Sequence, residues 1–393
     1  MRPFSLIKSL SSMHEISLVS LLCDPYEQEL GKDVVRYCAS IDYVPHPKWQ
    51  AYANCVRAFP TPMPLRVAYY RSPAFTRRIL QVIHERHIDV IHGELIKVVP
   101  ALRAVLSREQ IPILYDSVDA ISSYLFQQWS STTNLLQKGF VYTELKKMCR
   151  YEVQSLTAFD QVIITSSYDR DYLAQLGGLQ HIQVIPNGID TEYFIPPKVP
   201  RESDSLVFCS KLDYYPNSQA ILNFCDKVLP LIWQQRPQVR LTIVGNNPPE
   251  AVLRLSVDER ITVTGYVPDI RPYLGNASVV LAPLLMAAGI QNKVLEALAM
   301  GAPTVATPLA CRSLDTEHGK HLLIAEEAEA YAGAVLRLLE DAQLAGSLSQ
   351  AGRQFVERYH SWPEIARQLT ILYARVKSTA SKPEQLAGIA GAF

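Results

Sequence analysis

The chain has 393 residues, in which 38 Lys and Arg residues balance 38 Asp and Glu residues, and 48% of its residues are hydrophobic. At roughly 100 to 200 residues per domain, this length predicts two or three domains with buried cores. The zero net charge argues against a nucleic-acid partner, because such proteins depend on an excess of positive charge. The charged fraction of 19% argues against a disordered chain.

Membrane and export signals are weak. The longest apolar stretch, residues 278–290, is interrupted by a proline and is shorter than the roughly 18 residues that a spanning helix needs. The opening MRPFSLIKSL holds a lysine within its apolar run, which argues against a secretory signal. The seven cysteines are widely spaced and include no C-x-x-C pair. We therefore expect reduced thiols in a cytoplasmic protein.

The first half alternates short apolar runs with longer amphipathic stretches, a pattern typical of repeated strand and helix units. Five continuous apolar runs predict buried parallel strands, at 16–23, 88–93, 111–116, 161–165 and 182–186. The composition then changes over residues 189–205, which are rich in prolines and charges and have no periodicity. This segment predicts a linker.

The second half repeats the alternation. Its apolar runs predict strands at 206–210, 239–245, 261–265, 278–283 and 303–307, followed by helices to about residue 376. The pattern predicts an α/β fold of two Rossmann-like, doubly wound domains, 1–188 and 206–360. We expect a helix at 361–377 that crosses back to the first domain, and a mobile tail at 378–393.

The start of the first domain is unusual for this architecture. A doubly wound domain normally opens with a strand, a glycine-rich turn and a helix. Here the chain opens on the helix, with Phe4, Ile7 and Leu10 at roughly helical spacing. We expect that the first strand is missing from the centre of the sheet and that the native start lies upstream of Met1. The alternative is a helix that no strand ever preceded.

Lys211 directly follows the first predicted strand of the second domain, within FCSKLDYYPN. Doubly wound sheets bind ligands at the carboxyl ends of their strands, and a lysine there is suited to hold a phosphate. The alternative interpretation is a solvated loop lysine.

The stretch from Gly289 to Asn292 precedes a predicted helix in AAGIQNKVLEALAMGAP. The free amides of Gly289, Ile290, Gln291 and Asn292 would attract an anion at the helix N-terminus. Lys293 lies in the first turn, where its charge opposes the helix dipole unless an anion is nearby. Glu296 lies three residues on and shares its face. The alternative is an ordinary Lys–Glu pair on the surface of a core helix.

These segments, with PNGID at 186–190 and GYVPDIRPYLGNASVVLAP at 265–283, resemble the retaining family 4 glycosyltransferases of the GT-B fold. The likeness is densest over residues 162–362 and is closest to members from bacterial exopolysaccharide loci. It implies transfer of a sugar from a nucleotide-sugar donor, bound by the second domain, to a saccharide or lipid-linked saccharide held by the first. No metal or other cofactor is expected.

The resemblance also implies roles for particular residues. Lys211 and Lys293 would hold the diphosphate, and Glu296 would accept hydrogen bonds from the ribose hydroxyls. The base would lie against Tyr266 and Val267. Negative charge grows on the leaving diphosphate, so preplaced cations and amides would act where that charge develops. Asp119 is the candidate group of the acceptor-side domain.

Three positions depart from the family pattern. Ala288 stands where a glutamate is frequent near the transferred sugar, Val118 stands where a histidine is common before Asp119, and H-x-H is replaced by His92-Gly93-Glu94. These departures suggest one alternative, a catalytically impaired protein that binds the donor or a partner. A second alternative is a nucleotide-sugar epimerase on the same fold.

Two further motifs have a structural and a functional interpretation. The D-R-D triplet at 169–171 matches a metal-binding pattern, but its place after Ser166 predicts a helix cap. The KKMCR run at 146–150 predicts a solvated helix face. Its alternative is contact with anionic lipid, which would place the protein at the periphery of the inner membrane face.

Overall fold

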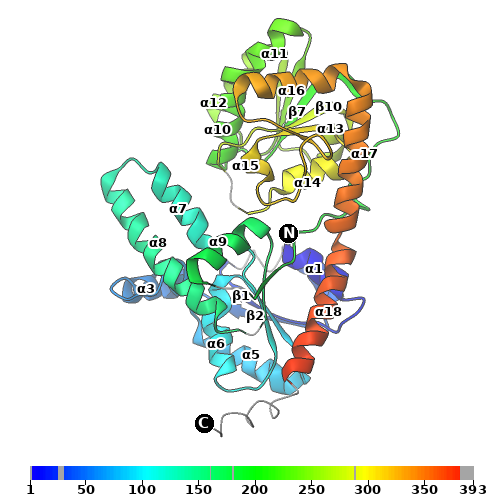
Figure 1. Cartoon of the computed structure of the whole chain (residues 1–393). Helices are drawn as coiled ribbons and strands as arrows, with labels where there is room; N and C mark the ends of the chain where they lie inside the picture. Colours follow the sequence, from blue (N-terminus) through cyan, green and yellow to red (C-terminus); the bar gives the residue numbers. More distant parts are fainter. Residues whose placement is uncertain (1, 25–30, 160, 179–180, 287–288, 381–393) are drawn as a thin grey trace, which may run out of the picture. The chain divides into compact units, whose positions relative to one another are not determined.

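The computed structural model describes residues 2–24, 31–159, 161–178, 181–286 and 289–380. The chain forms two compact units (Figure 1). The first unit holds Met1–Pro186 and Ile365–Phe393, and the second holds Asn187–Glu364. The chain therefore returns to its first unit within the last helix, α18 (Trp362–Ala380).

The second unit is built on a six-stranded parallel sheet in the order β12-β11-β10-β7-β8-β9. Its strands are β7 (Glu202–Cys209), β8 (Arg240–Val244), β9 (Ile261–Gly265), β10 (Ala277–Ala282), β11 (Thr304–Ala306) and β12 (Leu323–Ile324). Its helices are α10 (Tyr215–Asn223), η3 (Phe224–Val228), α11 (Leu229–Gln235), α12 (Glu250–Leu253), η4 (Arg254–Val257), α13 (Arg271–Asn276), α14 (Asn292–Ala299), α15 (Pro308–Cys311), α16 (Ala328–Glu340) and α17 (Ala342–Tyr359). Because β7 begins at Glu202, the end of the segment predicted as a linker is a strand.

Both faces of this sheet are covered, which explains the continuous apolar runs of its strands. In β10, Val279 and Leu281 pack into a core that also receives side chains of α11 and α16. The alternate residues Val280 and Ala282 pack into a second core with side chains of α14 and α17. The helices α14 and α16 accordingly lie on opposite faces of the sheet (Figure 1).

The first unit contains two parallel sheets, one of strands β1-β2 and one in the order β3-β4-β5-β6. The strands are β1 (Ser17–Leu22), β2 (Ser40–Pro45), β3 (Ile91–Glu94), β4 (Ile113–Asp116), β5 (Gln161–Ile164) and β6 (Ile182–Val184). The helices are α1 (Arg2–Leu10), η1 (Lys32–Tyr37), α3 (Lys48–Ala58), α4 (Leu65–Tyr69), α5 (Pro73–Arg86), η2 (Ile96–Val98), α6 (Val99–Leu106), α7 (Ile121–Ser131), α8 (Leu135–Leu156), α9 (Ser167–Gly177) and the greater part of α18. The predicted α/β class is confirmed in both units.

The two sheets of the first unit are separate. Within the described ranges β1 and β3 do not pair, and β1 ends one sheet while β3 ends the other. All six residues of β1 are half-buried although four of them are apolar, whereas β4 is buried throughout. A further strand between β1 and β3 stays a prediction.

Two observations concern membranes and thiols. In the part of the chain that the structure describes, none of the helices is both long and apolar enough to cross a membrane. The seven cysteines form no disulfide among the described residues.

Candidate functional site

The strand order of the second unit reverses at one place in its sheet. The chain builds β7, β8 and β9 outward on one side and β10, β11 and β12 outward on the other. The order therefore reverses between β7 and β10, and open α/β sheets bind ligands outside the carboxyl ends of the strands at such a point. The two segments that leave these strands contain Lys211 and residues 289–293.

Lys211 lies at the carboxyl end of β7, as predicted. Its side chain is 66% exposed, and its ammonium lies 3.5 Å from a carboxylate oxygen of Asp213. The loop runs close to the end of β8: a Cβ atom added to Gly245 would lie 1.8 Å from the Ser210 carbonyl oxygen. Only glycine allows this approach, so Gly245 fixes the path of the loop that carries Lys211.

Lys293 lies in the first turn of α14, also as predicted, and its ammonium points at the end of β7. The Nζ atom donates a hydrogen bond to Asn217 Oδ1 at 2.6 Å and lies 6.0 Å from the centre of the Phe208 ring. Burial lowers the pKa of this lysine to about 8. No ion pair joins the ammonium to a carboxylate among the residues that the structure describes.

Asn217 connects the two predicted lysine positions. Its side-chain amide donates a hydrogen bond to the carbonyl oxygen of Lys211 at 2.8 Å, while its oxygen accepts from Lys293. The side chain is buried, with the residue 7% exposed. The structure thus brings the Lys293 side chain to the backbone of Lys211, not to its ammonium. Sequence reasoning missed Asn217, although it closes the FCSKLDYYPN stretch.

Glu296 and Cys209 complete the surroundings of Lys293. Burial raises the pKa of the Glu296 carboxyl, and the charge of Lys293 partly opposes that rise. Burial, and secondarily Glu296, raises the pKa of the Cys209 thiol to about 12, so this thiol is neutral. The site therefore holds one half-buried cation beside a carboxyl that is itself costly to ionise, an arrangement that a bound anion would stabilise.

The backbone at the N-terminus of α14 has the features expected of the predicted anion site. Gly289 has φ 60°, the left-handed region that favours glycine. Gln291 occupies the N-cap position without a capping hydrogen bond from its side chain, and no acidic residue lies in the first turn. The first amides of the helix therefore lack the usual side-chain acceptor at the cap. Ile290 packs against the core, Asn292 is exposed, and Ala288 lies outside the described residues.

Tyr266 and Val267 lie farther along the sheet. They follow β9, the edge strand, directly after Gly265 with φ 69°. The Tyr266 side chain is 76% exposed, whereas Val267 packs against the core. Nothing described connects either residue with Lys293 or Glu296, so their predicted contact with a base stays a prediction.

Asp119 lies in the first unit, just beyond the carboxyl end of β4. Burial, and secondarily the charge of Asp169, raises the pKa of Asp119 to about 6. The preceding Val118 has φ 64°, a strained conformation for a β-branched residue. Its carbonyl oxygen accepts hydrogen bonds from the Thr165 amide at 3.1 Å and hydroxyl at 2.8 Å. Such maintained strain is frequent at functional sites.

A buried polar cluster beside Asp119 was not foreseen. Arg2 forms an ion pair with the fully buried Asp116 at 2.7 Å, and His92 Nε2 lies 3.5 Å from the same carboxylate. The other ring nitrogen of His92 is 2.6 Å from the hydroxyl of Tyr373 in α18. Burial alone would raise the pKa of Asp116. The combined lowering by Arg2 and His92 is larger than this rise, so the pKa of Asp116 lies below its ordinary value.

The D-R-D triplet is a helix cap, as predicted. The Asp169 amide donates to the Ser166 hydroxyl oxygen at 3.1 Å, and that hydroxyl donates to the Asp169 carboxylate at 2.7 Å. Within the described ranges, His, Cys, Asp and Glu side chains form no group of three or more suited to a metal.

Comparison with known proteins identifies the two halves. The family model "Glycosyltransferase Family 4" matches residues 4–193, and the model "Glycosyl transferases group 1" matches residues 203–341. HepE from Anabaena, solved in complex with UDP, has a TM-score of 0.71 at 16% identity, covering 94% of this chain and 95% of that one. Sucrose-phosphate synthase from Thermosynechococcus elongatus has a TM-score of 0.66 at 18% identity, covering 93% and 100%.

Relatives detected by sequence cover less of the chain. Phosphatidyl-myo-inositol mannosyltransferase of Mycolicibacterium smegmatis is 28% identical over 209 residues, 50% of this chain and 53% of that protein. The GDP-mannose-dependent alpha-(1-6)-phosphatidylinositol monomannoside mannosyltransferase of Mycobacterium tuberculosis is 26% identical over 236 residues, 53% and 60%. The matched regions thus span little more than half the length of these relatives. With its two parallel α/β units, the chain has the GT-B fold, and its two halves are similar to the Glycosyltransferase Family 4 and Glycosyl transferases group 1 models.

Proposed function

We propose that the protein is a glycosyltransferase that moves a sugar from a nucleotide-sugar donor, with retention of anomeric configuration, to a saccharide or lipid-linked saccharide. The reaction serves the assembly of a polysaccharide of the exopolysaccharide type. The observation that carries this proposal is the half-buried Lys293 ammonium, hydrogen-bonded to a neutral amide at the switch point of the sheet. A diphosphate would supply the negative charge that this site lacks.

The donor site follows from the residues around Lys293. Lys293 and the amides at 289–292 bind the diphosphate, and Lys211 reaches it from its exposed position. Glu296 accepts hydrogen bonds from the ribose, and the base lies against Tyr266 and Val267. As the bond to the anomeric carbon breaks, charge grows on the leaving phosphate, where the preplaced cations and amides stabilise it. This arrangement needs no metal ion.

The comparisons support a nucleotide-sugar donor and suggest the first nucleotides to test. Structures similar in fold are complexes of HepE with UDP and with UDP-glucose, whereas the names of two sequence relatives specify mannosyl transfer and one specifies GDP-mannose. Both UDP and GDP are therefore the appropriate probes.

The acceptor belongs to the first unit in this proposal. In this proposal Asp119 contacts an acceptor hydroxyl, and its raised pKa and the strained Val118 beside it support that role. The names of the mycobacterial relatives specify phosphatidylinositol acceptors, which supports a lipid-linked class. The protein would then act in the cytoplasm, at the inner membrane face.

The function is tested in two steps. Calorimetry with UDP and GDP should show binding of at least one nucleotide, which thermal unfolding should report independently. The corresponding nucleotide-sugars are then incubated with and without membrane lipid extracts, and the products are separated and their anomeric configuration is read by NMR. Transfer with retention supports the proposal. A new nucleotide-sugar formed without acceptor would indicate an epimerase, and binding without any turnover would indicate a donor-binding protein.

A further inference from the structure

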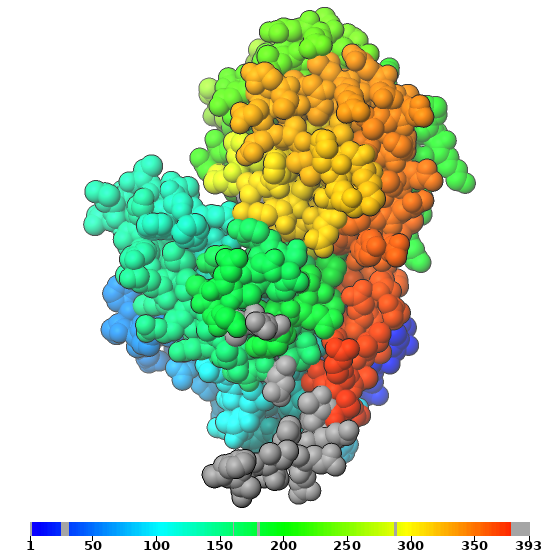
Figure 2. All heavy atoms as spheres, in the orientation of Figure 1, coloured from blue at the N-terminus to red at the C-terminus, as the bar shows by residue number. Residues whose placement is uncertain are grey.

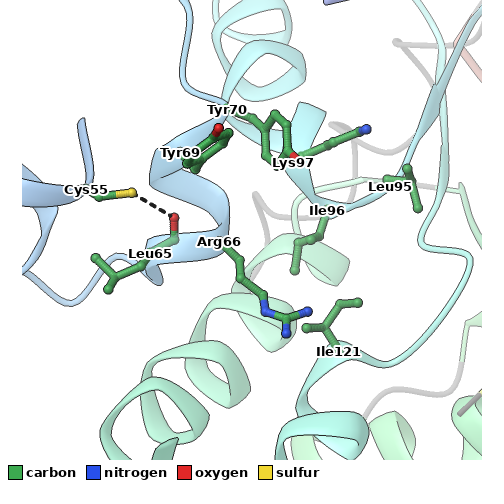
Figure 3. A pocket seen from close by; sticks show the side chains of 9 residues that line it. All are labelled: Cys55, Leu65, Arg66, Tyr69, Tyr70, Leu95, Ile96, Lys97 and Ile121. Atoms are coloured by element: carbon green, nitrogen blue, oxygen red, sulfur yellow. Dashed lines mark hydrogen bonds between the residues drawn. The ribbon is translucent and has the colours of Figure 1, made fainter. Parts of the chain in front are cut away.

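A cavity of about 590 Å³ lies within the first unit (Figure 3). Its walls come from α3, α4, the segment after β3 and the start of α7. Leu65, Ile96 and Ile121 contribute apolar side chains, and Tyr69 contributes an aromatic ring. Since β3 and β4 are paired parallel strands, the cavity lies at the carboxyl edge of their sheet, where α/β proteins place ligands.

Two cationic side chains line this cavity, and each lies near an aromatic ring. The Arg66 guanidinium lies 5.3 Å from the centre of the Tyr124 ring, and the Lys97 ammonium lies 5.0 Å from that of Tyr70. Burial raises the pKa of Glu94, and the charge of Lys97 opposes this rise only weakly. Lys97 and Glu94 form no ion pair. Across the described ranges neither cation is paired with a carboxylate, so the cavity carries positive charge that an anionic ligand would neutralise.

An apolar face of α3 adjoins the cavity. It consists of Trp49, Tyr52, Val56 and Phe59, spaced so that they share one side of the helix, and their exposed fractions are 73%, 63%, 74% and 63%. We call these four residues the α3 face. It reaches the cavity through the rings of Tyr52 and Tyr69, whose centres are 6.0 Å apart. An exposed aromatic and aliphatic surface of this kind marks an interaction site.

The sequence around the α3 face is basic, although Lys48 lies 3.9 Å from Asp24 and Arg78 is paired with Asp42 and Glu85. Between Asp42 and Glu85 the sequence contains no acidic residue. Over the same stretch it contains Lys48, Arg57, Arg66, Arg71, Arg77 and Arg78. This composition is complementary to an anionic surface.

The neighbouring helix α8 extends the basic surface. The Lys147 ammonium donates a hydrogen bond to the Phe59 carbonyl oxygen at 2.9 Å, which joins α8 to the end of α3. The glutamates of α8 are buried: Glu144 accepts from the Leu65 amide and lies 3.4 Å from the Lys147 ammonium, and Glu152 accepts from the Ile121 amide. Lys146 is exposed. The blue α3 and the cyan-green α8 are both seen at the surface in Figure 2.

We propose that the cavity and the α3 face together bind an anionic lipid of a bilayer. The lipid phosphate lies against Arg66 and Lys97, and the hydrocarbon chains contact Trp49 and its neighbours on the α3 face. Aromatic side chains with flanking lysines and arginines are suited to this interface, where one end of the ring is apolar and the other is wet. The inference rests on the proposed function, because it makes the acceptor of the sugar a phosphate-bearing lipid.

The test is sedimentation of the full chain with vesicles. Vesicles of phosphatidylcholine are compared with vesicles containing phosphatidylglycerol as the anionic component, at low and high salt. We expect partitioning onto the anionic vesicles that weakens with salt, because the attraction is partly electrostatic. Equal binding to both vesicle types, or none to either, would overturn the inference.

Two groups of variants distinguish the contacts to the lipid phosphate from the contacts to the hydrocarbon chains. Arg66→Gln and Lys97→Gln should each weaken vesicle binding about fivefold, whereas Arg86→Gln and Lys227→Gln, at exposed positions elsewhere, should not. The double variant Trp49→Ser/Val56→Ser should weaken it roughly tenfold, because less apolar area is buried. Its control is Leu253→Ser/Val257→Ser, on an exposed surface of the second unit. If test and control variants behave alike, the assigned surface is wrong.

Two other occupants of this site are tested: a soluble phosphate compound and a second copy of the chain. Glycerol phosphate is titrated by calorimetry, and affinity equal to that for vesicles would overturn the lipid assignment. Light scattering of the wild type and Trp49→Ser/Val56→Ser is compared, and a dimer that dissociates in the variant without any vesicle binding would assign the face to a second copy. UDP and GDP binding is measured on every variant. Vesicle binding lost with nucleotide binding intact supports the lipid site, and a wild type that binds nucleotide but no vesicle refutes this inference alone.

Discussion

The Lys293 ammonium donates a hydrogen bond to Asn217, with 2.6 Å between Nζ and Oδ1, and the Asn217 amide donates in turn to the Lys211 carbonyl oxygen. One buried amide thus ties the first turn of α14 to the loop after β7. These two segments leave the neighbouring strands β10 and β7, between which the sheet order reverses. The relationship fixes where the cation lies at this switch point before any ligand binds.

Replacing Asn217 by Ala should weaken nucleotide binding and also reduce stability. The variant loses both hydrogen bonds and leaves two part-buried partners unsatisfied, which costs about 1 to 3 kcal/mol. Calorimetry with UDP or GDP and thermal unfolding measure the two effects, with Asn223→Ala as a control at a half-buried amide outside the site. Wild-type affinity in Asn217→Ala would mean that this link does not position Lys293.

Nucleotide affinity should depend on pH through Lys293. Burial lowers its pKa to about 8, so the free protein loses this charge as the pH rises through 8. A bound diphosphate stabilises the ammonium and raises its pKa, so affinity should fall between about pH 7 and pH 9. The terminal phosphate has a second pKa of about 6, so most of its ionisation is complete by pH 7 and it contributes little to the change in this window. Lys293→Arg, which stays charged, should flatten the profile, and an unchanged slope in that variant would exclude Lys293 as its source.

The lowered pKa of Lys293 should also affect stability. Stability should rise with pH, whereas nucleotide affinity should fall. The folded pKa of Lys293 lies below the value in the unfolded chain, so the unfolded state binds more protons between about pH 8 and pH 10.4. The contribution of Lys293 to the free energy of unfolding should therefore rise with pH across this window. Chemical denaturation of the wild type and Lys293→Met at several pH values isolates this contribution.

Asp119→Asn should stabilise the first unit near neutral pH. The pKa of Asp119 is raised to about 6, so ionisation of this buried carboxyl opposes folding as the pH rises from about 4 to 6. We expect a gain of about 1 to 2 kcal/mol at pH 7 and none at pH 4. If Asp119 contacts the acceptor, the variant should retain nucleotide affinity and lose transfer. Full transfer activity in Asp119→Asn would remove it from the acceptor site.

Arg2→Ala should destabilise the protein strongly. It leaves the fully buried Asp116 carboxylate without its ion-pair partner, a loss that costs about 3 to 5 kcal/mol in other buried pairs. Denaturant unfolding measures the change, and Lys8→Ala is a control for removing a cation from the same helix. A change equal to that of the control would show that Asp116 is stabilised by His92 and its surroundings instead.

The fold could be predicted from sequence wherever strands are buried on both faces. The ten predicted strands correspond to observed ones because their apolar runs are continuous, as in β4 and β10. The strands β2 and β12 were missed, because β2 holds polar and half-buried residues and β12 has only two residues. The start of β7 was assigned to the linker, because its first residues are polar and exposed.

The site could be predicted only in part. Lys211, Lys293 and the turn before α14 were identified because strand ends and a helix N-terminus have local signals. Asn217 has no such signal, since its role depends on a partner 76 residues away. The cluster of Arg2, Asp116, His92 and Tyr373 joins residues up to 281 positions apart and depends on the return of α18 to the first unit.

The central claim is that Lys293 binds the diphosphate of the donor. The most direct test is calorimetric titration of UDP and GDP into the wild type and into Lys293→Met, with Lys227→Met as the matched control on the surface of the same unit. Loss of one charge-assisted contact of about 1.5 to 3 kcal/mol should weaken binding roughly tenfold or more, while the control keeps wild-type affinity. Equal affinity in Lys293→Met and the wild type would contradict the claim.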